Sequence, residues 1–421
     1  MRRCISKGTN RTCTQLLWRR GCGFTYFWRA FSSGKAVVLP SDGSSSHTSN
    51  CCWKNSASLI VAFHQWLHSD LSKCLTVKSF QSQQFLQDYE VLLLQRPDGS
   101  SFGGKIVFPG GLLADGDFST TEWQNVTGDF LKQFANPSGP RPPMYAQLHR
   151  RFSACSFLSP LIGLRLCALR ELFEETGLLL VEDHADSASS TTMAFILDPT
   201  EMHKWQTRVL SEPAAFAQLY HFFGFRPPLL ALKEWSNWLT PTPLRPRFDT
   251  MFFFVEVSAV KTQCSSPVSL KWQSTEALNL FADSPWSFFP LSRHLFVPPQ
   301  AYELGRLAQF SKLQKLSAFA TERAILGCRR WLPVMSRLTI LDKVCDIFFL
   351  PGDQRYTEVS QQDVNTTFSA GQLAQDTQRN RLILGPKLNE LWYDANVYDL
   401  GHVTPLSHTE YMNVADLVKS K

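Results

Sequence analysis

The sequence predicts a protein of mixed helix and strand structure, in the α/β or α+β class. Short apolar runs of strand length alternate along the chain with segments of helical periodicity. The 421 residues are 44% hydrophobic and 19% charged, so the chain can bury a large core and is not disordered as a whole. No apolar run reaches the roughly 18 residues of a membrane-spanning helix, which argues against an integral membrane protein.

Five short apolar runs are predicted to form strands. The second ends before the turn residues at 97–99, and the third runs into Pro109 and Gly110. The fourth is rich in Phe, a residue type that favours strands. The predicted strands cover residues 58–63, 89–95, 105–108, 249–257 and 347–350.

Helical periodicity predicts three helices, over residues 164–175, 205–222 and 300–319. The first stops at Gly177, a residue type that commonly ends a helix because it adopts a left-handed backbone conformation without strain. Residues 118–160 are polar and contain Pro at positions 137, 140, 142 and 143, so we expect them to be rich in loops.

The start of the chain differs in charge from the rest. Residues 1–31 contain seven Arg or Lys and no acidic residue, a composition typical of a mitochondrial transit peptide. Residues 29–33 resemble a matrix-protease cleavage pattern, with cleavage after Phe31; the alternatives are a disordered basic arm or a wrongly chosen start codon. Residues 32–50 are a Ser-rich linker. The net charge is +6 and would be −1 without those seven residues, so a basic field for nucleic acid is not supported.

Three glutamates stand out in the predicted helix 164–175. Glu171, Glu174 and Glu175 have the i, i+3, i+4 spacing that places them on one helix face. Their mutual repulsion would be relieved by a hard divalent cation such as Mg²⁺ or Mn²⁺, which prefers oxygen ligands. A solvated acidic face is the alternative for these three residues considered alone.

The wider context resembles the Nudix signature. Residues 170–178, Arg-Glu-Leu-Phe-Glu-Glu-Thr-Gly-Leu, match its second half at every fixed position. Gly111 matches the first half, and Asp117 stands where the signature usually has Glu. Residues 118–169 separate the halves, far more than the usual signature allows. This split box resembles one branch of the superfamily, the coenzyme A diphosphatases of the Nudix motif 19 type.

Other segments agree with this resemblance. Residues 92–96 and 107–111 are similar to the strand–loop–strand region of coenzyme A-cleaving Nudix enzymes, and residues 238–241 and 247–250 are similar to segments common in this branch. The resemblance implies a Nudix fold, in which helices enclose a mixed β-sheet. It further implies three parts: a Nudix domain over residues 51–312, an insertion over 118–163 within it, and a C-terminal α/β extension over 313–421.

The resemblance also implies roles for the signature residues. Glu171, Glu174 and Glu175 would bind Mg²⁺ or Mn²⁺, and Arg170 would orient a glutamate through a bidentate ion pair. Gly110 and Gly111 would let the loop fold tightly beside the helix. Asp117 would be peripheral to the metal. The general base would be one of the glutamates or an acid from another element; Glu256 is a candidate, and a solvent-facing strand residue is its alternative.

The implied reaction is hydrolysis of the pyrophosphate of coenzyme A or acyl-coenzyme A to 3′,5′-ADP and (acyl-)4′-phosphopantetheine. Arg96, Lys105 and Arg247 are candidates to bind the phosphates, although each of them could equally be a surface charge. The partner is then a small nucleotide, with no nucleic acid expected. Two alternatives remain: another nucleoside diphosphate derivative, such as a dinucleotide or capped RNA, and an inactive Nudix module that only binds a ligand.

Two further features bear on function. Residues 99–105 fit the G-x-x-x-x-G-K pattern of a phosphate-binding loop, but Ile106 and a predicted strand follow in place of Ser or Thr and a helix, so we reject this motif. The basic start of the chain predicts the mitochondrial matrix. The peroxisome is the alternative, because animal relatives of this branch are typically peroxisomal, although residues 419–421 are not the usual peroxisomal signal.

Overall fold

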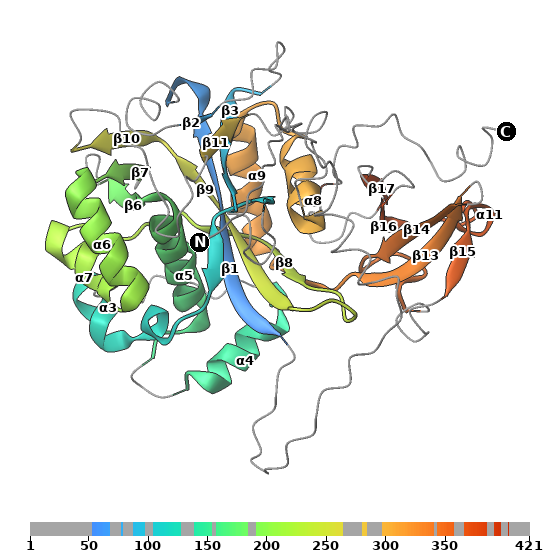
Figure 1. Ribbon diagram of the computed structural model, residues 1–421, viewed down its shortest axis with the longest axis horizontal. Helices are drawn as coiled ribbons and strands as arrows, with labels where there is room; N and C mark the ends of the chain where they lie inside the picture. The colour runs from blue at the N-terminus through green and yellow to red at the C-terminus, as the bar shows by residue number, and fades with distance from the viewer. Residues whose placement is uncertain are drawn as a thin grey trace, which may run out of the picture. The chain divides into compact units, whose positions relative to one another are not determined.

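The computed structural model in Figure 1 describes most of the chain after residue 52. The chain divides into two compact units, and all described residues belong to the second, Ser46–Lys421. The predicted transit peptide and Ser-rich linker lie outside the described residues. The described residues are 53–67, 77–78, 87–96, 104–127, 139–153, 157–183, 191–263, 280–283, 297–340, 343–357, 366–384, 391–396 and 403.

A mixed β-sheet forms the centre of this unit. Its two longest strands, β1 (Lys54–His64) and β9 (Phe248–Val257), pair in parallel, and β8 (Lys233–Leu239) joins β9 in antiparallel fashion. Along the sheet the strands follow the order β12-β8-β9-β1-β3-β11-β2, with β4 on β3 and β5 on β1. The remaining strands are β2 (Val77–Lys78), β3 (Tyr89–Gln95), β4 (Ile106–Val107), β5 (Gly110–Leu112), β11 (Leu280–Asp283) and β12 (Arg330–Trp331).

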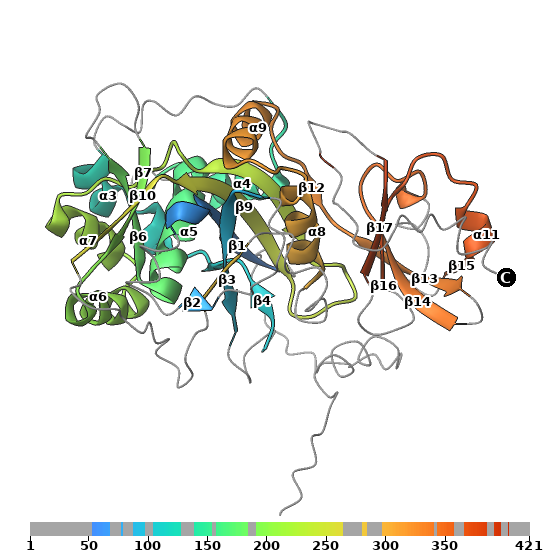
Figure 2. The ribbon, with the colours of Figure 1, turned by 90° about the horizontal axis from the view of Figure 1, so that it is seen from above.

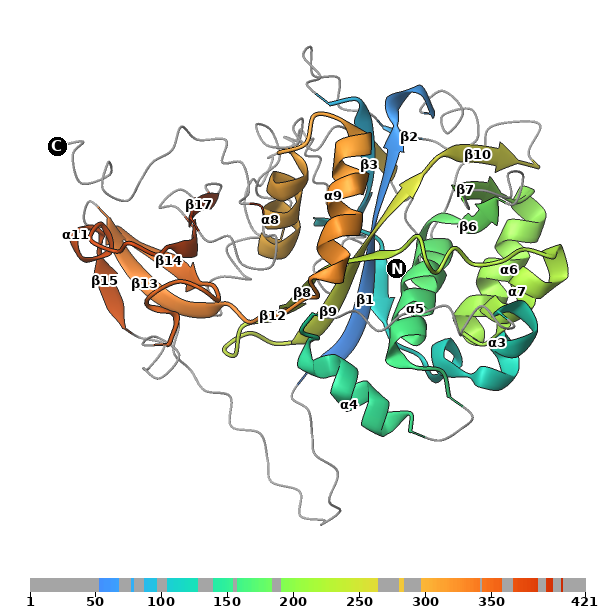
Figure 3. The same ribbon diagram turned by 180° about the vertical axis from the view of Figure 1, so that it is seen from behind.

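Alternate residues of the central strands face opposite sides of the sheet. Leu59 and Phe253 belong to the core shared with helix α5 (Pro160–Thr176). The neighbouring Phe254 points the other way and contacts Trp235, whose ring also contacts Phe319 of helix α9. Figure 3 shows α9 (Leu313–Ile325) on that side of the strands, together with α8 (Pro298–Leu307). The expected arrangement, helices on both faces of a mixed sheet, is confirmed.

A smaller sheet follows α5 in the chain. It has the order β10-β7-β6, formed by β6 (Leu178–Asp183), β7 (Thr191–Ile196) and β10 (Ala259–Thr262). Figure 2 shows helices α3, α6 and α7 gathered around it. Their bounds are Thr120–Thr127, Pro199–Ser211 and Ala215–Phe223.

Three aromatic residues, Phe118, Phe152 and Phe157, pack together where the insertion leaves and rejoins the domain, and we call this cluster the aromatic base. The ring of Phe118 stacks on that of Phe152 at 4.1 Å, and Phe152 contacts Phe157 at 5.1 Å. The amide of Leu158 donates to the carbonyl of Phe118 at 2.7 Å. Gly163 of α5 accommodates this base, because a Cβ there would lie 2.3 Å from the Phe118 ring. The insertion therefore begins and ends beside the start of α5 without displacing it.

The expectation that residues 118–160 are rich in loops was wrong for much of this stretch. It contains the last residue of the short 3₁₀ helix η2 (Asp115–Phe118) and two α-helices, α3 and α4 (Pro143–Arg151). Both helices pack on the domain: Trp123 of α3 contacts Phe216 at 5.9 Å, and the hydroxyl of Tyr145 in α4 donates to Glu234 at 2.8 Å. Polar composition and Pro concealed these helices, whose apolar residues become buried only through tertiary packing.

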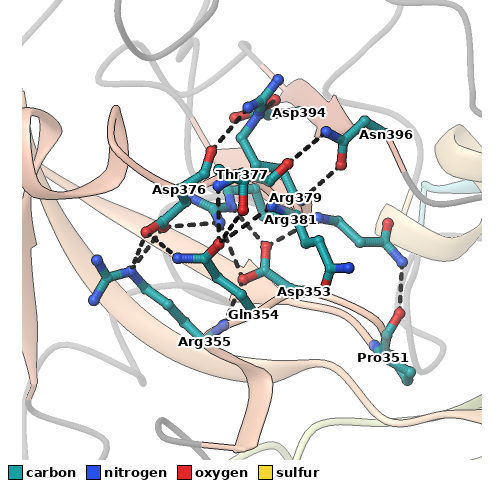
Figure 4. Close-up of polar contacts among 12 residues, drawn as sticks. Pro351, Asp353, Gln354, Arg355, Asp376, Thr377, Arg379, Arg381, Asp394 and Asn396 are labelled. Carbon is teal, nitrogen blue, oxygen red and sulfur yellow. Dashed lines mark hydrogen bonds and ion pairs between the residues drawn. The ribbon is translucent and has the colours of Figure 1, made fainter.

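The last part of the chain forms a five-stranded sheet with the order β15-β13-β14-β16-β17. Arg381 of β16 and charged residues of the adjoining turns form a network, shown in Figure 4, of which Arg381, Asp353 and Asp376 are buried. Arg381 binds both carboxylate oxygens of Asp353 at 2.8 and 3.0 Å and also contacts Asp376 at 3.0 Å. The elements are β13 (Val334–Ile340), β14 (Lys343–Phe349), β15 (Thr367–Ser369), α11 (Ala370–Leu373), β16 (Asn380–Leu384) and β17 (Leu391–Ala395).

The domain boundary expected after residue 312 falls between two helices of the same layer. Helix α9 begins at Leu313, whose amide donates to Asp88 at 2.8 Å, and Arg323 donates to the carbonyl of Glu234 on β8 at 2.8 Å. Helix α9 is thus part of the layer that covers the central sheet. Among the described helices, none is long and apolar enough to cross a membrane.

Candidate metal centre

Helix α5 carries the acidic residues in its last two turns. It begins at Pro160 and ends before Gly177, which has a φ of 74°. The carbonyls at this end are capped: the Thr176 hydroxyl donates to Leu172 at 2.6 Å, and the Gly177 amide donates to Phe173 at 2.8 Å. From α6, the buried amide of Gln206 donates to the carbonyls of Phe173 and Glu174, each at 3.1 Å. The positions of the acidic residues are therefore fixed by contacts outside the helix as well.

The short strand β5 brings two glycines against this helix. A Cβ on Gly110 would lie 2.5 Å from the carbonyl oxygen of Ala57 on β1, so only Gly fits so close to that strand. A Cβ on Gly111 would lie 2.2 Å from a carboxylate oxygen of Glu171. The two glycines thus allow close approach to different neighbours, one to the sheet and one to the helix.

Arg170 joins the two halves of the split signature. Its Nε and Nη2 donate to the two carboxylate oxygens of Asp117 at 2.7 and 3.0 Å, a bidentate ion pair. Nη2 also donates to the carbonyl of Leu112 at 2.9 Å. Both charged side chains are almost fully buried, with 3% and 1% of their surface exposed. Asp117 in turn accepts from the amide of Ala114 at 2.9 Å, which secures the loop.

The same guanidinium contacts two of the glutamates. Nη1 donates to Glu171 Oε1 and to Glu174 Oε1, each at 2.9 Å. The bidentate partner of Arg170 is therefore Asp117, whereas we expected a glutamate in that position. Asp117, expected to be peripheral, is the residue that fixes the arginine between the loop and the helix.

Glu175 lies apart from the arginine contacts. Its Oε2 accepts a hydrogen bond from the amide of Gly110 at 2.9 Å. Glu175 is buried, with 6% of its surface exposed. Contacts that link the loop and helix halves of the signature thus include Arg170–Asp117, Arg170–Leu112 and Gly110–Glu175.

Burial makes the negative charges at this site costly. It raises the pKa of Glu171 to about 7, although Arg170 acts in the opposite direction. Burial also raises the pKa of Glu174, and it raises the pKa of Glu175 well above its usual value, with repulsion from Glu171 adding to the effect. A divalent cation would offset this cost, and carboxylate oxygens are the ligands that Mg²⁺ and Mn²⁺ prefer.

Within the part of the chain that the structure describes, no three acidic, His or Cys side chains already converge in a metal-binding arrangement. The carboxylates of Glu171 and Glu174 contact Arg170 instead, so a bound cation would replace part of these contacts. By donor chemistry, spacing and burial, the three glutamates fit a hard cation.

Comparison with known proteins agrees with this geometry. The family model of the NUDT19 Nudix domain matches residues 53–307, which include both halves of the split signature. The chain belongs to the NUDT19 Nudix family. It is a Nudix hydrolase, as the split signature indicated.

Three relatives of this Nudix domain are named acyl-coenzyme A diphosphatase NUDT19. The Xenopus laevis protein is 34% identical over 330 residues, covering 73% of this chain and 81% of the relative. The Gallus gallus protein is 36% identical over 297 residues, covering 64% and 74%. The Homo sapiens protein is 31% identical over 335 residues, covering 73% and 81%.

A solved Nudix hydrolase from Alicyclobacillus acidocaldarius is also similar. The match covers 63% of this chain and 96% of that protein, with 18% sequence identity and a TM-score of 0.42. A likeness this distant supports no further argument about the fold.

Two of the basic residues expected at the Nudix site lie at the end of the β3–β4 pair. The amide of Arg96 donates to the carbonyl of Lys105 at 2.8 Å, so the two residues are neighbours across this pair. The positive charge of Arg96 acts on the carboxylate of Glu175 and lowers its pKa, against the larger effect of burial. Burial lowers the pKa of Lys105 to about 8. Arg96 therefore adds positive charge near Glu175 of the Nudix helix.

Arg247 lies elsewhere in the Nudix domain, directly before β9. Its Nε donates to the carbonyl of Thr240 at 2.9 Å, and its guanidinium lies over the Trp53 ring at 5.2 Å. The carbonyl of Arg247 accepts a hydrogen bond from the amide of Lys54, at the start of β1. Gly110 pairs with Ser58, further along that strand. These contacts give no support to the predicted role in phosphate binding.

Glu256, the candidate base, lies on β9 with its side chain toward α9. Its Oε2 accepts a hydrogen bond from the hydroxyl of Ser317 in α9. Its neighbours Val255 and Val257 face the core that contains α5, so Glu256 points to the opposite side of the sheet from the Nudix helix. This position gives no support to the predicted role as base.

Sequence reasoning missed the contributions of Asp117 and Gln206 to the Nudix site. The position of Asp117 within the signature is a signal for this role, because the signature usually has an acidic residue there. Gln206 had no such signal: it lies 32 residues from Glu174 in the chain, and only the packing of α6 on α5 brings the two together.

Proposed function

We propose that the protein hydrolyses the pyrophosphate bond of coenzyme A or acyl-coenzyme A in a Mg²⁺- or Mn²⁺-dependent reaction. The products would be 3′,5′-ADP and (acyl-)4′-phosphopantetheine. The observation that carries this proposal is the set of largely buried glutamates on α5, linked to the loop through Arg170 and Asp117. The names of the three relatives support the choice of substrate.

The proposed metal ligands are Glu171, Glu174 and Glu175. A divalent cation bound by them would neutralise negative charge on the pyrophosphate oxygens. Arg170 keeps the carboxylates of Glu171 and Glu174 together on one side of the helix. Gly110 does the same for Glu175 from the loop side. These contacts keep the three carboxylates on one stretch of the helix, and a cation would draw them together by replacing part of the Arg170 contacts.

Water attacks one phosphorus in the proposed reaction. Its oxygen forms the new P–O bond, the bond from that phosphorus to the bridging oxygen breaks, and the other phosphate ester leaves. A carboxylate accepts the proton from the water. We propose one of the three α5 glutamates for this step, since the position of Glu256 on the other side of the sheet gives that residue no support.

Arg96 and Lys105 are the proposed phosphate contacts. Their proximity to each other, and the effect of Arg96 on Glu175, support this proposal. Cationic side chains beside the leaving phosphate would stabilise its negative charge. The contacts of Arg247 with Trp53 and Thr240 argue for a structural role instead.

The experiment compares coenzyme A with its dephospho form and identifies the products by mass spectrometry, with Mg²⁺ present. Release of 3′,5′-ADP and phosphopantetheine is expected. Turnover of a dinucleotide or of capped RNA without turnover of coenzyme A would favour the alternative nucleotide substrates. Absence of any turnover by a folded protein that binds Mn²⁺ would favour the ligand-binding module.

We also propose that the protein acts in the mitochondrial matrix, with the peroxisome as the alternative. The acid-free, Arg-rich composition of residues 1–31 supports this proposal. The test is imaging of a C-terminally tagged protein with and without these residues. An unchanged distribution after the deletion would count against it.

A further inference from the structure

Ser58 is a buried polar residue of β1 beside the loop that carries Gly110. Its hydroxyl donates to the carbonyl of Pro109 at 2.8 Å, and only 5% of the residue is exposed. The amide of Leu59 donates to the same carbonyl at 2.9 Å. The Pro109 oxygen therefore accepts two hydrogen bonds from β1, one from a side chain and one from the backbone.

The carbonyl of Pro109 and the amide of Gly110 belong to one peptide unit. A trans peptide is planar, so its C=O and N–H point in opposite directions. Because the C=O is bound to β1, the N–H points away from β1, and it donates to Glu175 Oε2 at 2.9 Å. A single rigid peptide thus connects the Ser58 hydroxyl to the Glu175 carboxylate.

The loop has little freedom to adopt another position here. A Cβ on Gly110 would lie 2.8 Å from the Cβ of Ser58 and 2.5 Å from the carbonyl oxygen of Ala57. The backbone of β5 thus lies too close to β1 for a side chain at this position. The two hydrogen bonds to the Pro109 carbonyl restrict rotation of the Pro109–Gly110 peptide plane.

We propose that Ser58 is a positioning residue for the metal centre. By fixing the orientation of the Pro109–Gly110 peptide, it fixes the hydrogen bond that orients the carboxylate of Glu175 for a divalent cation. The inference rests on the proposed function in one respect, the assignment of Glu175 as a metal ligand. Ser58 lies outside both halves of the split signature, and its hydroxyl donates to the Pro109 carbonyl.

The variant Ser58→Ala removes one of the two donors and leaves the other. We expect the affinity for Mn²⁺ to fall by about three- to tenfold, below the typical 10–100-fold cost of losing a direct partner of a metal ligand, because the Leu59 amide remains. At saturating metal, the KM for coenzyme A should stay near its wild-type value while the metal concentration for half-maximal rate rises.

Ser56→Ala is the matched control. Ser56 lies on the same face of β1, is buried to a similar degree, and its hydroxyl contacts Thr250 Oγ1 at 2.7 Å on β9 instead of the loop. Its loss should lower the melting temperature comparably without changing the affinity for Mn²⁺. The two serines thus separate general support of the sheet from positioning of Glu175.

The experiment is a Mn²⁺ titration of the full-length protein without substrate, with free Mn²⁺ read by electron paramagnetic resonance. Weaker binding in Ser58→Ala than in both wild type and Ser56→Ala supports the proposal; equal binding in the two variants overturns it. If Ser58→Ala does not fold, Ser58→Cys replaces it, with a similar volume and a weaker donor, and wild-type affinity in that variant overturns the proposal. A folded wild type that binds no Mn²⁺ would instead contradict the proposed function.

Discussion

Arg170 and Asp117 form a buried bidentate ion pair, with N···O distances of 2.7 and 3.0 Å, across a separation of 53 residues in the chain. The pair closes the gap that the insertion opens in the Nudix signature. The aromatic base around Phe118 and Phe152 brings the two flanks together, and the ion pair then joins the loop to the helix. The insertion therefore leaves the site geometrically continuous.

The first prediction concerns this ion pair. Asp117→Asn should lower the free energy of unfolding by about 3–5 kcal/mol, because removing one partner leaves the buried charge of Arg170 poorly compensated. Asp115→Asn is the control, since Asp115 pairs with Arg151 on the surface, with 71% and 58% of the side chains exposed. That change should cost under about 1 kcal/mol. Urea denaturation measures both; equal costs would contradict this account of the pair.

The second prediction separates the two adjacent glycines. Gly110→Ala should destabilise the fold, because its Cβ would collide with the backbone of β1. Gly111→Ala should leave the fold nearly intact, because its Cβ meets the end of a side chain, that of Glu171, and not backbone, but it should lower activity by about 10–100-fold by displacing that carboxylate. Melting temperature and coenzyme A turnover distinguish the two effects. Gly371→Ala is the neutral control, since its Cβ would meet nothing within 4 Å.

The third prediction uses the pKa of Lys105. Burial lowers it to about 8, so the side chain is charged below that pH and loses its proton above it. If Lys105 binds a substrate phosphate, kcat/KM for coenzyme A should decline as the pH rises through about 8. Lys105→Arg keeps its charge throughout this range and should not show the decline. An identical pH profile in the two proteins would remove Lys105 from the site.

The fourth prediction concerns the cap that α6 provides for α5. Gln206→Met keeps the length of the side chain but leaves the Glu174 carbonyl without this donor, at a cost of about 1–3 kcal/mol in the free energy of unfolding. Gln206→Glu should cost more, because its negative charge would face the negative end of the helix dipole. Denaturation of the two variants provides the test, and a more stable Glu variant would contradict the assigned contact.

Local sequence patterns correctly predicted a regular strand and the end of one helix. Strand β3 covers residues 89–95, as predicted, and α5 ends before Gly177, as predicted. Helix α5 begins earlier than expected, at Pro160, because a proline in the first turn lacks only an amide that would be unpaired there.

Two helix predictions were wrong because each merged two helices that the structure separates by a short non-helical segment. The predicted helix 205–222 is two helices separated at Glu212 and Pro213, and the predicted helix 300–319 is divided between α8 and α9. Pro213 was a visible signal for the first break, since a proline inside a helix removes a hydrogen bond.

The three α5 glutamates and Arg170 could be selected from the sequence because the signature fixes their spacing on one helix. Placement of Glu256 could not, since it depends on which face of β9 the side chain occupies and on what covers that face. Placement of Arg247, directly before β9, depends on its contact with Trp53, which lies far from it in the chain. The buried network around Arg381 and Asp353 likewise joins residues that are far apart in the chain.

The central claim is that the α5 glutamates bind the cation that supports hydrolysis of coenzyme A. The most direct test follows coenzyme A with Mg²⁺ by mass spectrometry for wild type, Glu174→Gln and the surface control Glu201→Gln. We predict 3′,5′-ADP and phosphopantetheine from wild type and from the control, and a loss of at least about 100-fold in Glu174→Gln. Equal turnover by Glu174→Gln and wild type would contradict the account.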